Sequence, residues 1–372
     1  MESMRVPKQW DSRKRFDFLL MDLDFSSSPG YPYLKEAPTI GQWLGADETG
    51  EFNQQRVEKL WFDVQRVLAG DYPHLFRVFI KDEPHKIAKA ETNRWRMIVA
   101  SSLPVQMVWR MLFNEQNLAL NKNSARIPSK HGFIQCYGGW MTFLADLQSK
   151  GIKYSRDISG WDVGAPGFIF KIIGKLRQRW PGVSDSWMAA QRLVYDDAYE
   201  NSNLIFSNGV VVRQLFGGFM KSGLFSTIAD NSLAMVGIHI LAALRSGMPY
   251  GHFAATGDDV VQSHVTEEYL QELGRLGCRV KEVLPRIEFM GINYSSQRPE
   301  PIYTAKHLAN LMMKTCDLGD LFDAYGRLYG ESRLFPCWAQ LAAYMGVQMR
   351  SQDYYRFWYS NPWAATMVDW HL

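Results

Sequence analysis

The sequence predicts an α+β fold, in which short strands near the middle of the chain combine with amphipathic helices on either side. Three observations carry this prediction. Residues 252–265 show two strand patterns around a Gly-Asp-Asp turn, a long apolar helix pattern precedes them from about Ser226 to Gly247, and a strand-like KYSRDIS segment lies at residues 153–159. Alternation with a period of two indicates strands, and a period near 3.6 indicates helices.

The N-terminal part of the chain, to about residue 151, combines irregular segments such as SSSPGYPY with one clear helix pattern. Between Asn53 and Leu68, apolar side chains recur three and four residues apart, which places them on one helix face. These side chains are Val57, Leu60, Trp61, Val64 and Leu68. We expect this helix to pack on the core and the surrounding segments to handle a substrate.

A second helix is predicted between Pro166 and Trp180, after the KYSRDIS strand. Its apolar stripe consists of Ile169, Ile172, Ile173, Leu176 and Trp180, and Lys171, Lys175 and Arg179 lie off that stripe. Pro181 cannot continue the helix and therefore ends it. The stripe predicts which side of this helix faces the core.

The hairpin is the sharpest local signal. Gly257 can adopt backbone angles that a side chain would resist, as tight turns between strands require. The helix before it contains the most apolar stretch of the chain, from Leu233 to Leu244, which is interrupted by His239 and is too short to span a bilayer. We therefore expect a buried helix and no transmembrane segment.

The pattern changes after Arg298. Ala305, Leu308, Ala309 and Met312 stand at helical spacing behind Thr304, a candidate N-cap, and aromatic-rich helical text continues to Leu372. The sequence therefore predicts a small helical C-terminal subdomain.

Composition limits the classes of function. The chain has 372 residues, 47% hydrophobic and 21% charged, which allows a well-buried core and argues against disorder. Lys and Arg total 41 against 38 Asp and Glu, so overall charge does not by itself indicate a polyanionic partner. The four cysteines lack metal-ligand or disulfide spacing, and the N-terminus lacks an apolar signal core. A reducing, cytosolic setting fits best.

Acidic residues stand where carboxylates could converge on a metal ion. Asp157 ends the KYSRDIS strand, Asp162 follows it beyond a turn, and Asp258 and Asp259 stand at the hairpin tip. Adjacent buried like charges are costly without a counter-ion, and Mg²⁺ prefers carboxylate oxygens while keeping positions for phosphate and water. An isolated Asp-Asp pair is more often a surface turn. The motifs around it favour the metal site.

Polar residues at helical spacing lie between these acids. In the segment KSGLFSTIADNS, Ser222 and Gly223 precede Thr227 and Asn231. Thr227 and Asn231 are four residues apart and therefore share one helix face. Taken alone, these side chains could simply cap a helix.

A basic strip lies further toward the N-terminus. Between Arg77 and Arg96 there are six Lys and Arg against three Asp and Glu. Its candidates for binding a triphosphate are Lys81, Lys86, Lys89, Arg94 and Arg96. Arg offers phosphate a planar fork and Lys a mobile point charge. A solvated charged face explains this strip equally well when it is taken alone.

Taken in order, these segments resemble the motifs of positive-strand RNA virus RNA-dependent RNA polymerases, and are most similar to the sobemovirus and barnavirus group. KDEPHKIAKAETNRWRMI resembles motif F, RDISGWD motif A, SGLFSTIADN motif B and TGDD motif C. EEYLQELGRLG with CRVKEV resembles motif D, IEFMGINY motif E, and SSSPGYP the template-guiding motif G. The matches run from about Ser26 to Tyr294.

The resemblance implies a right-hand polymerase with fingers, palm and thumb, in which the palm is an antiparallel sheet backed by helices. The expected domains are 1–150 as the N-terminal fingers, 151–167 and 216–300 as the palm, 168–215 as a fingers insertion and 301–372 as a helical thumb. The implied activity is template-directed addition of ribonucleoside monophosphates from NTPs to an RNA 3′ end, for viral genome replication and transcription.

The resemblance also implies a role for each matched residue. Asp157, Asp258 and Asp259 would bind two Mg²⁺ or Mn²⁺ ions, and Lys281 would protonate the leaving pyrophosphate. Ribose recognition would fall to Asp162, Ser222, Thr227 and Asn231, triphosphate binding to Lys81, Lys86, Lys89, Arg94 and Arg96, and template guiding to Ser28, Pro29 and Gly30. A solvent-facing lysine is an equally good interpretation of Lys281.

The implied partners are an RNA template, the nascent RNA strand and NTPs, with a protein primer and other viral replication proteins as further candidates. The implied location is the host cell cytoplasm, with membrane-associated replication complexes as one setting. Two rival interpretations remain. A reverse transcriptase would usually carry a bulky steric gate where Asp162 stands, and a catalytically silent RNA-binding scaffold would not need the three intact acids.

Overall fold

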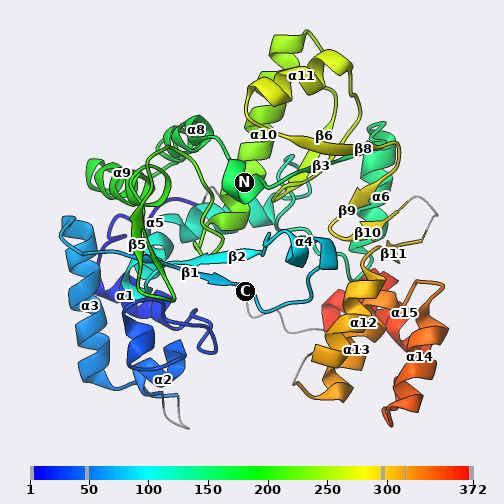
Figure 1. Ribbon diagram of the computed structural model, residues 1–372, viewed down its shortest axis with the longest axis horizontal. Coiled ribbons are helices and arrows are strands. Elements are labelled where there is room, and N and C mark those ends of the chain that lie inside the picture. The colour runs from blue at the N-terminus through cyan, green and yellow to red at the C-terminus, as the bar shows by residue number, and fades with distance from the viewer. Residues whose placement is uncertain (1–3, 47–49, 295–297, 314–315, 368–372) are drawn as a thin grey trace.

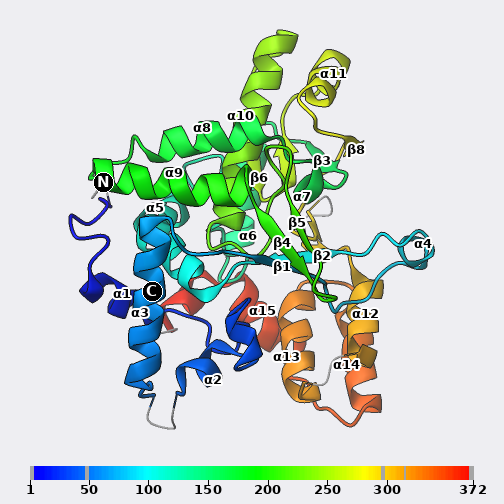
Figure 2. The ribbon, with the colours of Figure 1, turned by 60° about the vertical axis from the view of Figure 1, so that its left-hand side comes forward.

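The computed structural model describes residues 4–46, 50–294, 298–313 and 316–367. Figure 1 shows three regions: an N-terminal region of helices and a sheet, a central sheet with long helices, and a group of C-terminal helices. Strands β1 and β2 and the loop with α4 extend from the first region toward the C-terminal helices (Figure 2). The domain boundaries drawn from the sequence stay predictions.

The central sheet is antiparallel, with strand order β6-β7-β3-β8. Its strands are β3 (Tyr154–Ile158), β6 (Phe253–Thr256), β7 (Asp259–Gln262) and β8 (Val280–Leu284). The pairing of Thr256 with Asp259 leaves Gly257 and Asp258 as a two-residue turn, and Gly257 has a φ of +62°. The hairpin and the KYSRDIS strand are confirmed.

Helix α10 (Thr227–Ser246) packs against β6, α8 and α11, so it forms the core of this region. It begins after Ser226 and ends at Gly247, as predicted. Among the described residues it is the one helix long and apolar enough to cross a membrane, and more than half of its apolar window is buried. Because the helix extends beyond Leu233 and Leu244, its length is sufficient to cross a membrane. Its burial against β6, α8 and α11 is what favours a core helix.

Helix α8 (Gly167–Arg177) corrects one prediction from the sequence. Ile169 and Ile173 are buried as expected, but Ile172 and Leu176 are about half exposed. Arg177 takes the inward position instead, because its guanidinium is bonded to Asp230 on α10. The apolar stripe predicted for α8 therefore identifies only part of the face that the helix buries.

A second sheet lies in the N-terminal region, with strand order β2-β1-β4-β5. Its strands are β1 (Phe76–Ile80), β2 (Met97–Ala100), β4 (Asn203–Phe206) and β5 (Val211–Arg213). β1 pairs antiparallel with β2 and parallel with β4, which joins segments more than a hundred residues apart. Around it lie α1 (Arg13–Leu20), the 3-10 helix η1 (Tyr33–Lys35), α2 (Ile40–Leu44), α3 (Gln54–Ala69), α4 (Ile87–Glu91), α5 (Leu103–Lys122) and α9 (Asp185–Tyr199).

Helix α3 confirms the first predicted helix. The Asn53 side chain caps it by accepting a hydrogen bond from the Arg56 N–H, and Val57, Leu60 and Val64 are buried. The predicted stripe is therefore the one that faces the core, although its Trp61 and Leu68 are only partly covered.

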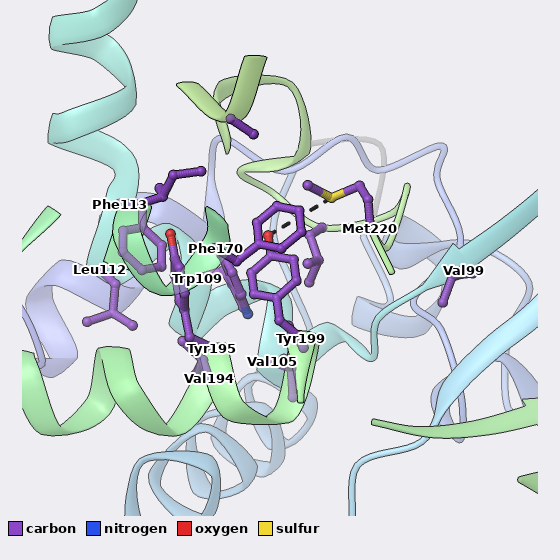
Figure 3. Packing of buried hydrophobic residues seen from close by; sticks show 14 of the residues in the cluster. Val99, Val105, Trp109, Leu112, Phe113, Phe170, Val194, Tyr195, Tyr199 and Met220 are labelled. Carbon is purple, nitrogen blue, oxygen red and sulfur yellow. Dashed lines mark hydrogen bonds between the residues drawn. The ribbon is translucent and has the colours of Figure 1, made fainter. Parts of the chain in front are cut away.

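The core joins α5, α8 and α9 through aromatic rings (Figure 3). Trp109 on α5 stacks on Tyr195 of α9 with ring centroids 5.4 Å apart, and Phe170 on α8 stacks on Tyr199 at 4.0 Å. Such pairs add specific geometry to the burial of large apolar area. The Tyr199 hydroxyl lies 4.0 Å from the Met220 sulfur, so this core reaches the loop that leads into α10.

The C-terminal region is helical, as predicted for its described residues. It contains α12 (Thr304–Met313), α13 (Leu318–Tyr329), α14 (Phe335–Tyr344), α15 (Gln352–Ser360) and the 3-10 helix η2 (Pro362–Met367). Thr304 is the first residue of α12, where the sequence suggested a cap. The end of the predicted helical text, residues 368–372, lies outside the described residues.

This region joins the central sheet through a small three-stranded sheet and one further helix. The strands are β9 (Glu288–Phe289), β10 (Ile292–Asn293) and β11 (Glu300–Pro301), and the helix is α6 (Gly139–Ser149). The predicted helix and strand before them are α11 (Glu267–Arg275), capped by Thr266, and β8. The strand turn predicted in IEFMGINY is the β9–β10 hairpin.

Candidate active site

The three acids predicted to bind metal lie on neighbouring strands of the central sheet, and we call Asp157, Asp258 and Asp259 the acidic triad. β3 pairs antiparallel with β7, with Arg156 opposite Val260. Asp157 and Asp259 therefore stand at the same end of the sheet, and Asp258 occupies the turn beside them. The fold thus brings together two segments a hundred residues apart.

Carboxylates this close together hold their protons more tightly. Burial, followed by the charges of Asp258 and Asp157, raises the pKa of Asp259 to about 6. Burial also raises the pKa of Asp258, with Asp157 adding to the effect. Both residues remain accessible to solvent at the hairpin turn. In the described part of the chain no Lys or Arg forms an ion pair with either, so their negative charge is available to an external cation.

Lys281 lies directly beside the acidic triad. β3 and β8 are paired so that Asp157 stands opposite Glu282, and Lys281 Nζ lies 2.5 Å from Asp157 Oδ2 and 3.4 Å from Glu282 Oε1. The hydrogen bond that Lys281 donates to Asp157 raises the pKa of Lys281. The predicted proton donor and a predicted metal ligand therefore form a half-exposed ion pair.

The donor set of the acidic triad fits a hard divalent cation, because all its donors are carboxylate oxygens. As the side chains stand, however, no three His, Cys, Asp or Glu within the described residues converge closely enough to hold a metal ion. Of the three acids, Asp157 is the one that accepts a hydrogen bond from Lys281.

Asp162 and Asn231, two of the predicted ribose contacts, lie near the acidic triad. Asp162 belongs to the short helix α7 (Trp161–Gly164), which follows β3. Burial and the nearby Asp258 raise the pKa of Asp162, and Arg96 acts in the opposite direction. Asn231 lies on α10, and its Oδ1 accepts a hydrogen bond of 2.8 Å from Trp161 Nε1. Sequence reasoning missed Trp161, because nothing in the motif indicates where its indole points.

The other two predicted ribose contacts use their hydroxyls within the protein. Ser222 Oγ accepts from the Val99 N–H at 3.1 Å, which ties the loop before α10 to β2. Thr227 Oγ1 donates to the carbonyl oxygens of Lys221 and Leu224, at 2.9 and 2.8 Å. The structure gives both residues a role in holding this loop, and their contact with ribose stays a prediction.

The five predicted triphosphate contacts occupy the segment between β1 and β2, which includes α4. Lys81 and Arg96 form ion pairs with Glu83, at 3.3 and 3.4 Å, and Arg94 Nε donates to Thr92 Oγ1. Lys86 is the N-cap residue of α4, and Lys89 lies within this short helix. Arg96 is the member that the structure brings near the acids, since its charge opposes the raised pKa of Asp258 and Asp162.

Glu83 and Lys306 form a link that the sequence did not reveal. Lys306 Nζ on α12 lies 2.9 Å from Glu83 Oε2, although the residues are 223 positions apart. Burial works to raise the pKa of Glu83, but Lys306 and Lys81 outweigh it and lower the pKa to about 2. The basic strip is therefore fastened to the C-terminal helices, as the approach of α4 to α12 in Figure 2 shows.

Tyr303 is a second residue that the sequence analysis missed. Burial, then the charges of Asp259 and Asp157, raise the pKa of its hydroxyl. Tyr303 directly precedes α12 and is about half exposed. Its hydroxyl therefore lies close enough to the acidic triad for electrostatic interaction. A lone tyrosine before a helix offers no sequence signal for such a position.

The predicted template-guiding segment lies against the start of α5. The Pro29 carbonyl accepts from the Leu103 N–H at 2.8 Å. Gly30 has a φ of +70°, and a Cβ there would lie 2.2 Å from the Ser101 carbonyl oxygen, so a side chain is excluded. Contact of Ser28, Pro29 and Gly30 with a template stays a prediction.

A cavity of about 500 Å³ lies elsewhere, between α6, α10 and the start of β6. Its buried polar groups already have protein partners: Lys130 Nζ donates to the carbonyls of Ser124 and Ala125, and His239 is bonded to Tyr250 and Tyr269. The acidic triad stands at the opposite end of β6. This cavity is therefore separate from the candidate chemistry.

Comparison with known proteins identifies the family of this chain. The family model described as viral RNA-dependent RNA polymerase matches residues 5–280, so the chain belongs to that family. The RNA-directed RNA polymerase of Mushroom bacilliform virus is 29% identical over 59% of this chain and 54% of its own length. The replicase polyprotein P2AB of Southern bean mosaic virus is 31% identical over 56% of this chain. The expected likeness to the barnavirus and sobemovirus group is confirmed.

The relatives are much longer than the segment that matches this chain. Protein P2-P3 of Poinsettia latent virus is 29% identical over 63% of this chain, but the match spans only 22% of that protein. For the replicase polyprotein of Southern bean mosaic virus the share is 21%. The chain thus matches about a fifth of these relatives.

A solved structure supports the predicted fold class. The Sicinivirus 3Dpol RNA-dependent RNA polymerase superposes with a TM-score of 0.73 at 16% identity, covering 93% of this chain and 78% of that one. The chain therefore has the α+β right-hand polymerase fold. The assignment of the central sheet to the palm stays a prediction.

Proposed function

We propose that this chain catalyses template-directed RNA synthesis, adding ribonucleoside monophosphates from NTPs to the 3′ end of an RNA strand. The observation that carries the proposal is the acidic triad, which stands at one end of an antiparallel sheet with unpaired charge at Asp258 and Asp259. Members of the viral RNA-dependent RNA polymerase family generally use divalent metal ions. We propose two Mg²⁺ or Mn²⁺ ions, held by Asp157, Asp258 and Asp259.

In this mechanism, bound divalent ions would activate the 3′-hydroxyl and stabilise the charge that develops during in-line phosphoryl transfer. The chain's own residues orient the reactants. Arg96 lies on the basic strip facing the acids, where it neutralises triphosphate charge together with Lys81, Lys86, Lys89 and Arg94. Lys281, a protonated amine beside Asp157, supplies the proton that the leaving pyrophosphate takes up.

Selection of ribose is assigned to Asp162 and Asn231. Both side chains lie on the segments that flank the acidic triad, and Asp162 is close enough to Asp258 for their charges to interact. Polar groups built around a 2′-hydroxyl are left unpaired when deoxyribose binds, so such a site rejects deoxynucleotides strongly. This favours RNA synthesis over reverse transcription.

We also propose the partners and the setting of this activity: an RNA template, the nascent strand, NTPs, and a protein primer or other viral replication proteins. The support is that one relative bears the name replicase polyprotein, in which this segment would adjoin other viral proteins. The proposed location is the host cell cytoplasm, in membrane-associated replication complexes.

The test is incorporation of labelled nucleotides by the purified chain on a primed RNA template with Mg²⁺ or Mn²⁺. Asp258→Ala serves as the inactive comparison and deoxynucleotides are supplied in a parallel reaction. Template-dependent incorporation of NTPs by the wild type alone is expected. Equal incorporation by both proteins would overturn the proposal, preference for deoxynucleotides would indicate a reverse transcriptase, and RNA binding without synthesis would indicate a scaffold.

A further inference from the structure

We infer that Trp161 is a positioning residue for sugar selection, because its indole N–H fixes which end of the Asn231 amide faces the nucleotide. This inference rests on the proposed function and names a residue that the motif comparison does not assign. Trp161 Nε1 lies 2.8 Å from Asn231 Oδ1, and both side chains are buried, with exposures of 3% and 6%.

The chemistry of the indole decides the orientation of the amide. An asparagine side chain presents a carbonyl oxygen at one end and an NH₂ group at the other, and a half-turn exchanges them. The indole Nε1–H of Trp161 is a donor only, so the end of Asn231 that faces it must be Oδ1. The Nδ2 group is therefore fixed at the opposite end of the amide.

The Nδ2 group remains for a ligand. In the described part of the chain it has no protein hydrogen-bond partner, and the Oδ1 bond to Trp161 is the one side-chain bond of Asn231. A hydroxyl both donates and accepts, so a 2′-hydroxyl can donate to the Asp162 carboxylate and accept from Asn231 Nδ2. With the amide turned over, two acceptors would face the hydroxyl and one would go unpaired.

Both ends of the Trp161–Asn231 bond are held firmly. Trp161 begins α7 after Gly160, whose φ of +63° makes the sharp turn away from β3, and its ring lies in the main core. On the other side, Asp230 precedes Asn231 on α10 and accepts hydrogen bonds from Arg177. The bond therefore joins two rigid elements, and α7 also carries Asp162. The donor and the acceptor that would contact the 2′-hydroxyl are thus set relative to one another.

The decisive variant is Trp161→Phe, which removes the indole N–H and keeps an aromatic ring in the core. The measured quantity is the ratio of kcat/KM for an NTP to that for the matching dNTP. Since loss of one oriented hydrogen bond is worth up to about a tenfold change, we expect this ratio to fall by about tenfold. The ratio does not depend on the fraction of active protein, so a loss of folded enzyme alone cannot produce the change.

The matched control is Trp187→Phe. The Trp187 indole is fully buried and donates to the Leu112 carbonyl at 3.1 Å, away from the acidic triad. This variant loses the same N–H from an equally buried ring, so it should leave the ratio unchanged. In an Asn231→Ala background, Trp161→Phe should cause no further fall, because the amide that it positions is gone.

Asn231→Asp tests the Asn231 side of the hydrogen bond and leaves the Trp161 ring in place. It keeps an oxygen for the Trp161 indole and replaces the NH₂ group by an acceptor, so we expect the ratio to fall as in Trp161→Phe. An unchanged ratio in Trp161→Phe or in Asn231→Asp, or an equal further fall in the Asn231→Ala background, would overturn the inference alone. A wild-type protein that makes no RNA would overturn the proposed function, and the inference with it.

Discussion

Asp230 on α10 and the acidic triad on the central sheet are both carboxylate sites, but the protein treats them in opposite ways. Asp230 is fully buried, and its Oδ1 accepts from Arg177 Nε and Nη2 at 3.0 and 2.6 Å. Its Oδ2 accepts from the hydroxyls of Tyr195 and Tyr199 at 3.0 and 3.1 Å. Asp258 and Asp259 instead stand side by side at an open turn, where among the described residues no basic side chain pairs with them.

The difference separates a carboxylate that is paired within the protein from carboxylates that the protein leaves uncompensated. A buried carboxylate with all its lone pairs used by the protein fixes the packing of α8, α9 and α10. Carboxylates placed together without a cation cost folding free energy, and such sites cluster where a protein binds ligands or performs chemistry. Asp230 is therefore expected to contribute to stability, and the role proposed for the acidic triad accounts for its uncompensated charge.

The largest expected effect is on activity. Asp258→Asn removes one charge from the acidic triad without changing its shape, so RNA synthesis should fall by about 10³-fold or more, because several kcal/mol of transition-state stabilisation depend on the bound cations. Single-turnover incorporation measures it, with Asp185→Asn, an exposed acid on α9, as the control. Thermal stability should stay the same or rise. Retention of more than about a tenth of the activity would contradict this role.

The next effect is on stability. Asp230→Asn leaves the Arg177 guanidinium buried without its counter-charge, so the free energy of unfolding should fall by about 3–5 kcal/mol. Denaturant unfolding monitored by tryptophan fluorescence measures the loss. Adding Arg177→Met should restore part of it, since replacing both partners removes the unpaired charge. A loss below about 1 kcal/mol would mean that the network is not structural.

The acidic triad also predicts how stability depends on pH. The pKa of Asp259 in the folded protein, about 6, lies above its ordinary value of 3.8, so the folded state binds this proton more tightly than the unfolded state. The resulting stability is fully present below about pH 4 and is lost as pH rises through about 6. Thermal midpoints of metal-free protein should therefore fall across this window, and Asp259→Asn should reduce the fall. If the thermal midpoints of the two proteins depended on pH in the same way, Asp259 would not be the group that titrates in this window.

Mg²⁺ sharpens this prediction, because it binds only the ionised carboxylates. It should raise the thermal midpoint of the wild type above pH 6 and have little effect near pH 4. A stabilisation that is the same at both pH values would point to cation binding elsewhere on the chain.

The smallest expected effect concerns the turn that presents the acids. Gly257→Ala places a Cβ at a φ of +62° and 3.2 Å from Ile228 Cδ1, which should cost about 1–2 kcal/mol. Gly274→Ala in α11 is the matched control, because its Cβ would enter open space, and alanine favours helix. Urea unfolding of the two variants compares them, and equal stabilities would show that the turn tolerates a side chain.

Local features of the molecule could be predicted from the sequence, and distant pairings could not. The hairpin at Gly257 and the limits of α10 follow from nearby residues, because turn chemistry and helix periodicity act over a few positions. The inward side of α8 was predicted only in part. Arg177 faces the core there because Asp230, 53 residues away, pairs with it.

The site shows the same limit. The motifs named the acids and the basic strip, but the hydrogen bond from Trp161 to Asn231 spans 70 residues and the Glu83–Lys306 pair spans 223. No local sequence pattern predicts either contact, because only the tertiary fold brings the two partners together. The ion pair of Lys281 with Asp157 likewise depends on the register of β3 against β8.

Direct binding of Mn²⁺ tests most directly whether the acidic triad is held open for a cation. Isothermal titration of Mn²⁺ into the metal-free wild type at pH 7, repeated with Asp258→Asn and with Asp185→Asn, measures the Kd of each protein. The wild type and Asp185→Asn should bind with the same Kd, and Asp258→Asn should bind at least about tenfold more weakly, since it lacks one charged ligand. Equal affinity in all three proteins would contradict the role assigned to these carboxylates.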